Sequence, residues 1–409
     1  MKKIKAVLLI LSLIFFIGCW DRREPEDNIS VIAIGFDYDV EEEKYKLITQ
    51  IVSPIASHGG LGESGLEDKP QFWTVSSLGH TTLDALGNIR QKVSRYIHYS
   101  HTQIFVISEG FLEKKGILPV IDVLERSRDS RPIILLTVTK DDPEEILRKE
   151  MAVEGLSGKG IREMIELTDS EVGVTTVEHS RIFINKLSQP GIEAIAPMLN
   201  FYDENSNSDN ENNEDNEEDI DVGMSPAFKL GGLAAFNKDR LVGFLEAREA
   251  RGWNWIRGKI NRAVLNLELP VNDNKLATII INQSAVKVKP IIEEGEAKIK
   301  IEIGAAALLQ GIMGTAEINK ESQLTHSIKR RTAQVIRNDI KQAIEKAKEL
   351  ESDIFGFGNL FYRKENSFWQ TVEDDWEKEF IDLAIEIEVE VEFKRAGMIN
   401  QSINIPNLN

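Results

Sequence analysis

The chain has 409 residues, and its 67 Asp and Glu against 49 Lys and Arg give a formal net charge of −18 at pH 7. A protein this acidic repels the phosphate backbone of nucleic acids, so we exclude nucleic acid as a partner. The sequence holds one cysteine, Cys19, which excludes an internal disulfide framework and any metal site built from several cysteines. Because one hydrophobic core seldom holds more than about 250–300 residues, we expect several domains.

Residues 1–18 have the pattern of a secretory signal peptide, with lysines ahead of a short apolar run that ends at Gly18. The run is shorter than the roughly 20 apolar residues of a transmembrane helix, and no later stretch is a candidate to span a bilayer. The segment Phe16-Ile17-Gly18-Cys19 resembles the lipobox of bacterial lipoproteins.

The lipobox resemblance implies cleavage between Gly18 and Cys19, a diacylglycerol on the Cys19 sulfur and an acyl chain on its new amine. Acyl chains contribute about 0.8 kcal/mol for each buried methylene, so several of them hold a protein on a bilayer without a transmembrane helix. We therefore predict a lipoprotein that has the lipid bilayer as a partner.

In residues 19–170, strand and helix patterns alternate, which predicts a mixed α/β domain. In one of the helix patterns, apolar residues recur at helical spacing after Thr81 and Thr82, either of which can cap the helix. The predicted strands are 29–37, 45–52, 74–76, 103–108 and 132–139, and the predicted helices are 81–93, 117–125 and 143–148.

Residues 171–258 are predicted to form a smaller middle domain that includes a disordered acidic insert at 202–222. The insert consists mostly of Asp, Glu, Asn and Ser, so it has almost nothing to bury. An EF-hand calcium loop requires a glycine and a glutamate at fixed offsets, and neither spacing is present, so we predict no metal site there. The predicted elements are strands at 229–236 and 241–244, a turn at 237–240 between them, and a helix at 245–251.

Residues 259–399 carry the clearest pattern, and residues 400–409 form a tail. The predicted elements are strands at 277–288 and 297–309, a long helix at 327–350, and an alternating strand at 381–393. Glutamates share one face of that last strand, and we interpret them as a solvated surface that a basic partner or a neighbouring strand's Lys and Arg would complement. The predicted fold class is α+β: three mixed α/β domains with largely antiparallel sheets, the last a sheet packed against one long helix.

Three features that resemble catalytic or ligand sites fail on spacing. His98 and His101 have no evident third metal ligand, so we interpret them as part of a polar loop. Residues 155–160 are glycine-rich, but Ile161 stands where a Walker A loop needs Ser or Thr, so we interpret them as a flexible connection. Ser64 is not in a nucleophile elbow. We therefore predict no catalytic residue, no metal and no cofactor.

Three stretches follow one another over nearly the whole mature chain. They are Cys19-Trp20-Asp21-Arg22-Arg23-Glu24 with the strand at 32–37, the segment 232–253, and the segment 352–358 that runs on to Trp369 and Trp376. In this order and spacing they resemble the Ger(x)C family, the lipoprotein C subunits of spore germinant receptors in endospore-forming bacteria.

The resemblance implies a non-enzymatic subunit that works with integral-membrane A and B subunits and is required for germination in response to nutrients. It also implies a location on the outer face of the spore inner membrane, where the lipid would hold the protein. Cys19 is the one functional residue that carries over from the family.

The third stretch also has a local structural interpretation. Gly356 and Gly358 are predicted to end the long helix and to permit positive φ or close chain approach. Phe355 and Phe357 can cover the helix end, and Asp353 can cap backbone amides in the turn. We therefore interpret Asp353, Gly356 and Gly358 as a structural motif.

Two other classes of function are considered beside this one. A solute-binding lipoprotein of a transport system would need two similar α/β lobes around a cleft, and the order of the predicted elements argues against two similar lobes. A cell-wall hydrolase would need a positioned acid, base or metal, and none is evident in the sequence.

Overall fold

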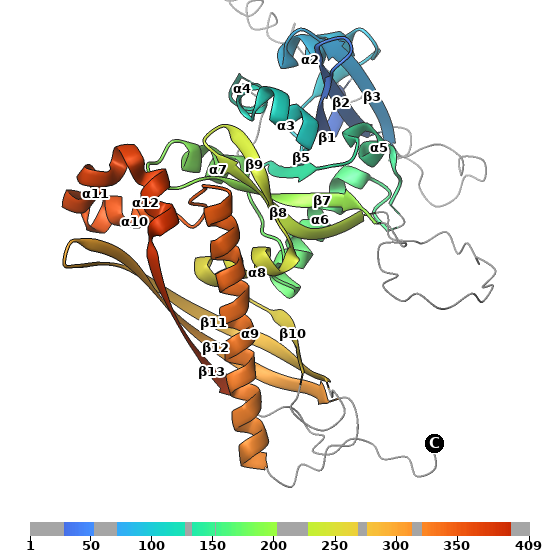
Figure 1. Ribbon diagram of the computed structural model, residues 1–409. Coiled ribbons are helices and arrows are strands. Elements are labelled where there is room, and N and C mark those ends of the chain that lie inside the picture. Colours follow the sequence, from blue (N-terminus) through green and yellow to red (C-terminus); the bar gives the residue numbers. More distant parts are fainter. Residues whose placement is uncertain are drawn as a thin grey trace, which may run out of the picture.

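The structure is a computed structural model that describes residues 28–52, 72–126, 133–151, 153–202, 228–268, 276–312 and 321–393. These residues form an α+β fold with two sheets and helices packed on them (Figure 1). The strand order is β3-β2-β1-β5-β6-β7-β8-β9 in the larger sheet, with β4 paired to β1, and β10-β11-β12-β13 in the smaller one. The predicted signal peptide, most of the acidic insert and the tail lie outside the described residues.

The larger sheet is mixed, with parallel ladders at its centre and antiparallel hairpins at its ends. β1 pairs with β5, β5 with β6 and β6 with β7 in parallel, whereas β1-β2-β3 and β7-β8-β9 are antiparallel. The strands are β1 (Asn28–Asp39), β2 (Lys44–Val52), β3 (Phe72–Gly79), β4 (Tyr96–His98), β5 (Ile104–Ser108), β6 (Leu135–Thr139), β7 (Ile195–Phe201), β8 (Phe228–Asn237) and β9 (Arg240–Leu245).

Helices cover both faces of this sheet. Phe105 and Ile107 of β5 join one apolar core, and Ile104 and Val106 join another, so the two cores lie on opposite faces of the strand. One core contains residues of α2 (Thr82–Arg90), α3 (Glu109–Lys115), α4 (Leu118–Arg126) and α7 (Ser180–Leu187), and the other contains residues of α5 (Pro143–Arg148) and α6 (Ser157–Glu171). Cover on both faces explains why every residue of β5 and β6 is buried, and why β5 is apolar from residue 104 to residue 107.

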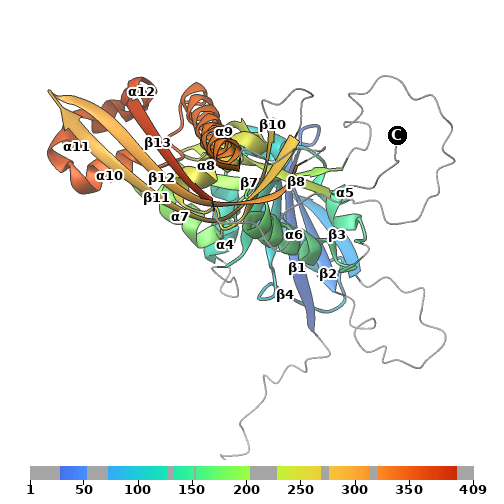
Figure 2. The same ribbon diagram turned by 90° about the horizontal axis from the view of Figure 1, so that it is seen from below.

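The smaller sheet has helices on one face. Its strands are β10 (Ala263–Glu268), β11 (Leu276–Glu293), β12 (Glu296–Ile312) and β13 (Ala384–Phe393), and α8 (Ala247–Arg257) and α9 (Glu321–Glu349) cover it (Figures 1 and 2). Ile301 of β12 and Ile340 of α9 are buried in the shared core, whereas Lys300 on the opposite face of β12 is partly exposed. Gly252 lets α8 approach α9 closely, because a Cβ there would lie 2.1 Å from the Asp339 carbonyl oxygen.

A cluster of short helices follows α9 and leads the chain back to β13. These are α10 (Phe357–Lys364), α11 (Asn366–Val372), the 3-10 helix η5 (Glu373–Asp375) and α12 (Trp376–Asp382). Their aromatic side chains pack on one another, with ring centroids 5.7 Å apart for Phe361 and Trp376 and 5.3 Å apart for Trp369 and Trp376. Aromatic packing of this kind holds short helices that would not be stable alone.

Several predicted elements are confirmed, and two are wrong. The hairpin of β1 and β2, the N-cap of α2 by Thr81 and the alternating strand β13 are present. Residues 155–160 do not form a flexible connection: they lead into α6, where the Gly158 N–H donates to Gln50 Oε1 at 2.9 Å. Ile381 and Asp382 end α12, so the last strand begins at Ala384.

The strands of the predicted middle domain belong to the larger sheet. β7 pairs with β6 and continues into β8 and β9, so the boundary at residue 170 does not coincide with a break between sheets. The sequence pattern also did not predict α3, α7, β7 and β10. All four of these elements have fewer than nine residues, so periodicity alone could not define them.

Candidate functional site at the junction of the two sheets

The predicted site residues fall into two groups. Gly18 and Cys19 lie outside the described residues, so cleavage and lipidation stay predictions. Asp353, Gly356 and Gly358 lie between the end of α9 and the first turn of α10, in a segment that bonds to residues just before β7 and at the end of β8. We call the contact region between residues 351–359 and the larger sheet the junction.

The carboxylate of Asp353 is buried and accepts four hydrogen bonds from residues that follow it in the chain. Oδ1 accepts from the backbone N–H of Gly356 at 2.9 Å and of Phe357 at 3.1 Å. Oδ2 accepts from the Gly358 N–H at 2.7 Å and from the Trp376 indole Nε1 at 3.1 Å. The backbone donors converge there because the first N–H groups of α10 have no acceptor inside the helix.

The same environment acts on the ionisation of Asp353 in two directions. Burial raises the pKa of Asp353 to about 6, and the hydrogen bonds from the backbone and from Trp376 oppose that rise. Those donors stabilise the ionised carboxylate. Asp353 therefore holds the turn together as an acceptor for groups of its own chain, and all of these partners are structural.

The two glycines permit close approach between chain segments. Gly356 has a φ of +74°, a conformation that L side chains rarely adopt. A Cβ on Gly358 would lie 2.6 Å from the Trp376 ring and 2.8 Å from the Cα of Gly191. The prediction that the glycines end the long helix is wrong, because α9 ends at Glu349 and Gly356 immediately precedes α10.

Hydrogen bonds across the junction join the larger sheet to the turn that Asp353 organises. On the side of the larger sheet, the donors and acceptors belong to residues 190–193 and to the end of β8. On the other side, they belong to residues 351–359. The bonds are Asn359 N to Gly191 O (2.7 Å), Asn359 Nδ2 to Pro190 O (3.0 Å), Glu193 N to Asp353 O (3.0 Å), Ser352 Oγ to Phe236 O (2.5 Å) and Asn237 Nδ2 to Glu351 O (3.1 Å).

Glu193 is a second acidic side chain at the junction. Its carboxylate accepts the Lys238 backbone N–H at 2.6 Å, and the Lys238 ammonium pairs with Glu377 at 3.0 Å. Burial, together with the nearby charges of Asp353 and Glu377, raises the pKa of Glu193 to about 7, although the bond from the Lys238 N–H opposes the rise. This part of the junction is therefore sensitive to pH near neutrality.

A buried ion pair lies beside the junction, between α7 and the segment that precedes it. Lys186 and Glu178 are 2.7 Å apart, with 8% and 1% of their side chains exposed. The ammonium groups of Lys186 and Lys259 lie 5.5 and 5.4 Å from the centroid of the Trp253 ring of α8. Burial lowers the pKa of Lys186, and Glu178 opposes that shift. The Lys186 contact joins α8 to α7, a helix that packs on the larger sheet.

The acidic face of β13 is explained by the neighbouring strand. Lys298 of β12 pairs with Glu386 at 2.9 Å, and Lys300 pairs with Glu388 at 2.8 Å. The interpretation that lysines of an adjacent strand offset the glutamates is thus confirmed for these two positions.

The two histidines rejected as metal ligands lie at the end of β4 and shortly after it, so the interpretation as part of a polar loop is wrong for His98. His98 belongs to β4 and His101 is exposed, and Ser64 lies outside the described residues. The part of the chain that the structure describes contains no group of three metal-ligating side chains. Within the same residues, no helix is both long and apolar enough to cross a membrane.

Two family models together match most of the chain. Residues 21–201 match the one described as spore germination protein N-terminal domain, and residues 231–397 match the one described as spore germination B3/GerAC like, C-terminal. Spore germination protein KC of Bacillus subtilis (strain 168) is 25% identical over 405 residues, which is 98% of each chain. Spore germination protein B3 of the same strain is 21% identical and covers 97% of this chain and 99% of its own.

A solved structure has the same fold. The crystal structure of the GerBC protein aligns with a TM-score of 0.51 at 16% identity, and the alignment covers 88% of this chain and 97% of that one. The sequence matches place the chain among the spore germination proteins, and the solved structure shows that the α+β fold is shared. The chain belongs to the Ger(x)C family, with both the N-terminal and the GerAC-like C-terminal region present.

Proposed function

We propose that this protein is the lipoprotein C subunit of a nutrient germinant receptor, required for spore germination in response to nutrients. It acts with integral-membrane A and B subunits on the outer face of the spore inner membrane, where acyl chains on Cys19 hold it. The observation that carries the proposal is the match to spore germination protein KC over 98% of both chains. The sequence Gly18-Cys19 after a short apolar run supports the anchor.

We also propose that the subunit works by contact and not by catalysis. The buried acid of the junction supports this view, because three backbone N–H groups and one indole N–H already occupy the Asp353 carboxylate. A general acid or base needs a free position for a substrate proton. The alternative of a solute-binding lipoprotein finds no support in the two sheets, which differ in strand number and in pairing.

The experiment is the substitution Cys19→Ala in the native host, with Arg23→Ala as a control that keeps the thiol. We expect the Cys19→Ala protein to leave the membrane fraction of spores and to weaken the response to a specific nutrient, because the thioether and its acyl chains cannot form. The control should stay in the membrane fraction and respond normally.

Two outcomes would contradict parts of the proposal separately. If the Cys19→Ala protein stays with the membrane, the lipid anchor is wrong. If deletion of the whole chain leaves germination with every nutrient in a broad panel unchanged, the receptor role is wrong whatever the anchor does.

A further inference from the structure

The solvent-facing side of the smaller sheet changes character along its length. Side chains on this side form rows across β11, β12 and β13, because residues in register on adjacent strands point to the same face. The four successive rows are Lys289–Lys300–Glu386, Lys287–Glu302–Glu388, Ala285–Gly304–Glu390 and Gln283–Ala306–Glu392.

The glutamates of the first two rows form ion pairs with lysines, and the glutamates of the last two rows do not. Lys298 and Lys300 meet Glu386 and Glu388, and Lys289 meets Glu302 at 2.9 Å. In register with Glu390 and Glu392, β12 carries Gly304 and Ala306, which have no charged side chain. Neither of these two glutamates has an ion pair with another described residue.

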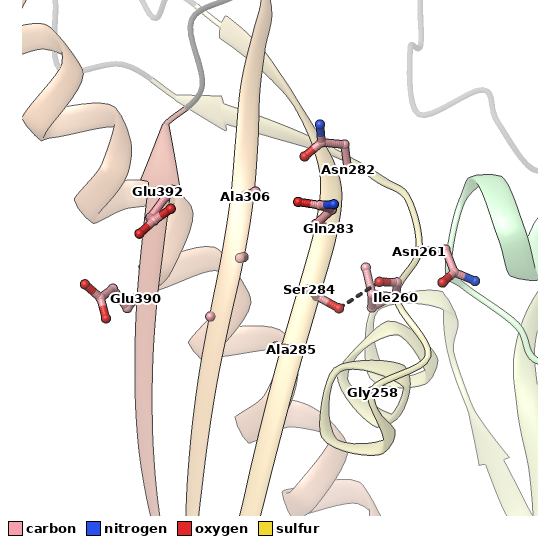
Figure 3. Close-up of a pocket in the computed structure, with 12 residues that line it drawn as sticks. Gly258, Ile260, Asn261, Asn282, Gln283, Ser284, Ala285, Ala306, Glu390 and Glu392 are labelled. Atoms are coloured by element: carbon pink, nitrogen blue, oxygen red, sulfur yellow. Dashed lines mark hydrogen bonds between the residues drawn. The ribbon is translucent and has the colours of Figure 1, made fainter.

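A hollow of about 500 Å³ lies over these last two rows. Glu390 and Glu392 stand on its β13 side, Asn282 and Ser284 stand on its β11 side, and Ala306 of β12 lies between them (Figure 3). Gly304 of β12 also lines the hollow. A Cβ added at Gly304 would meet no atom within 4 Å, so the glycine is not required for packing inside this chain. Its effect is to leave the hollow open.

The backbone is irregular at the same place. The register between β11 and β12 shifts between Ile281 and Gln283, so that Asn282 is an extra residue on β11. Bulges of this kind redirect side chains and interrupt the regular alternation of a strand, and they are frequent beside binding sites. Here the bulge places an amide side chain at the margin of the hollow.

We propose that this hollow is a docking site for a lysine- or arginine-bearing segment of another polypeptide, with Glu390 and Glu392 as the partners of its cations. The neighbouring rows show the contact that is missing, since each glutamate there is met by a lysine ammonium at 2.8 or 2.9 Å. The exposed amide of Asn282 adds a polar group suited to the peptide backbone, whereas the Ser284 hydroxyl already donates to the Ile260 carbonyl oxygen at 2.7 Å. This inference does not depend on the germination role.

The test uses the purified full-length chain in a non-ionic detergent and a labelled peptide of alternating lysine and serine with neutral ends. Fluorescence anisotropy at low ionic strength gives the Kd. Glu390→Gln/Glu392→Gln should weaken binding about fivefold or more, because two charge contacts are lost. The matched control Glu386→Gln/Glu388→Gln removes the same charge from the same strand and should change Kd by less than about twofold, since those positions already have lysine partners.

A second variant tests the hollow without removing a glutamate. Gly304→Lys places an ammonium beside Glu390 and fills the open space, so it should weaken peptide binding about fivefold or more while the melting temperature stays unchanged. Binding as in the wild type would overturn the proposal. Equal weakening by both glutamine pairs would also overturn it, because the peptide would then respond only to net charge.

The chain itself supplies one competing occupant. Lys394 and Arg395 follow β13 in the sequence. If the wild type fails to bind the peptide and Lys394→Gln/Arg395→Gln binds it, the hollow belongs to the chain's own basic pair and the partner proposal is wrong. If neither protein binds, the proposal is wrong as well.

Discussion

The junction and the solvent-facing rows of the smaller sheet are built from the same chemistry and differ in burial. At the junction, Asp353 is 4% exposed and relies on four hydrogen-bond donors of its own chain. On the sheet, Glu388 and Lys300 form an ion pair with 55% and 24% of their side chains exposed. Water solvates the second pair in the unfolded and the folded state alike, so its net contribution to stability is small.

The comparison shows that the number of charges in a region says little about how much they contribute to the stability of the fold. When a buried acceptor loses its donors, or buried donors lose their acceptor, no water replaces the lost partner. The folded state is then destabilised by the free energy of desolvating those groups. An exposed charge that loses its partner is solvated by water. We therefore expect substitutions at the junction to act on folding and substitutions on the rows to act on binding.

The largest effect is expected for Asp353→Ala. The substitution leaves the N–H groups of Gly356, Phe357 and Gly358 and the indole of Trp376 without their acceptor in a buried turn. We expect the free energy of unfolding to fall by about 3–5 kcal/mol, measured by urea denaturation of the purified chain. Asp353→Asn keeps one acceptor oxygen and should cost less.

This prediction has a clear contrary outcome. A loss below about 0.5 kcal/mol for Asp353→Ala, the range of ordinary surface substitutions, would show that the turn does not depend on its carboxylate. The junction would then be held by the hydrogen bonds that join residues 351–359 to residues 190–193 and to the end of β8.

A smaller and pH-dependent effect is expected for Glu193→Gln. The pKa of Glu193 is about 7 in the folded chain against its usual 4.5, so the folded state binds the proton more tightly than the unfolded state does. Between those pH values, ionisation therefore lowers the stability of the wild type. Glutamine cannot ionise, but its carbonyl oxygen can still accept the Lys238 N–H.

The sign of this effect can be measured directly. The two proteins should be equally stable near pH 4.5, and the variant should become more stable than the wild type as the pH rises through 7, by on the order of 1–2 kcal/mol. Urea midpoints from pH 4.5 to 8 would show the difference. Since Asp353, Lys238 and Glu377 also face Glu193, only the difference between the two proteins is diagnostic. A constant difference at all pH values would contradict the assignment.

The sequence defined the exposed rows better than the junction for a physical reason. Alternation in β13 is a local pattern, so its acidic face and the need for neighbouring lysines could be predicted from residues close together. Asp353 could be predicted to cap a turn because the backbone N–H groups from which its carboxylate accepts hydrogen bonds follow it within five residues. The contacts of Gly191 with Gly358 and of Phe236 with Ser352 join residues more than a hundred positions apart, and a single sequence has no signal for such pairs.

The smallest effect is expected for Lys300→Gln. Lys300 pairs with Glu388 at 2.8 Å and with Glu302 at 3.6 Å on the exposed face, so its removal should leave the melting temperature unchanged within experimental error at physiological salt. A loss of stability comparable to that of Asp353→Ala would mean that the first two rows are shielded from water in the folded protein. In that case the face that carries the first two rows would be covered by another part of the protein or by a partner. The hollow would then differ from these rows only in having Gly304 and Ala306, and no lysine, opposite its glutamates.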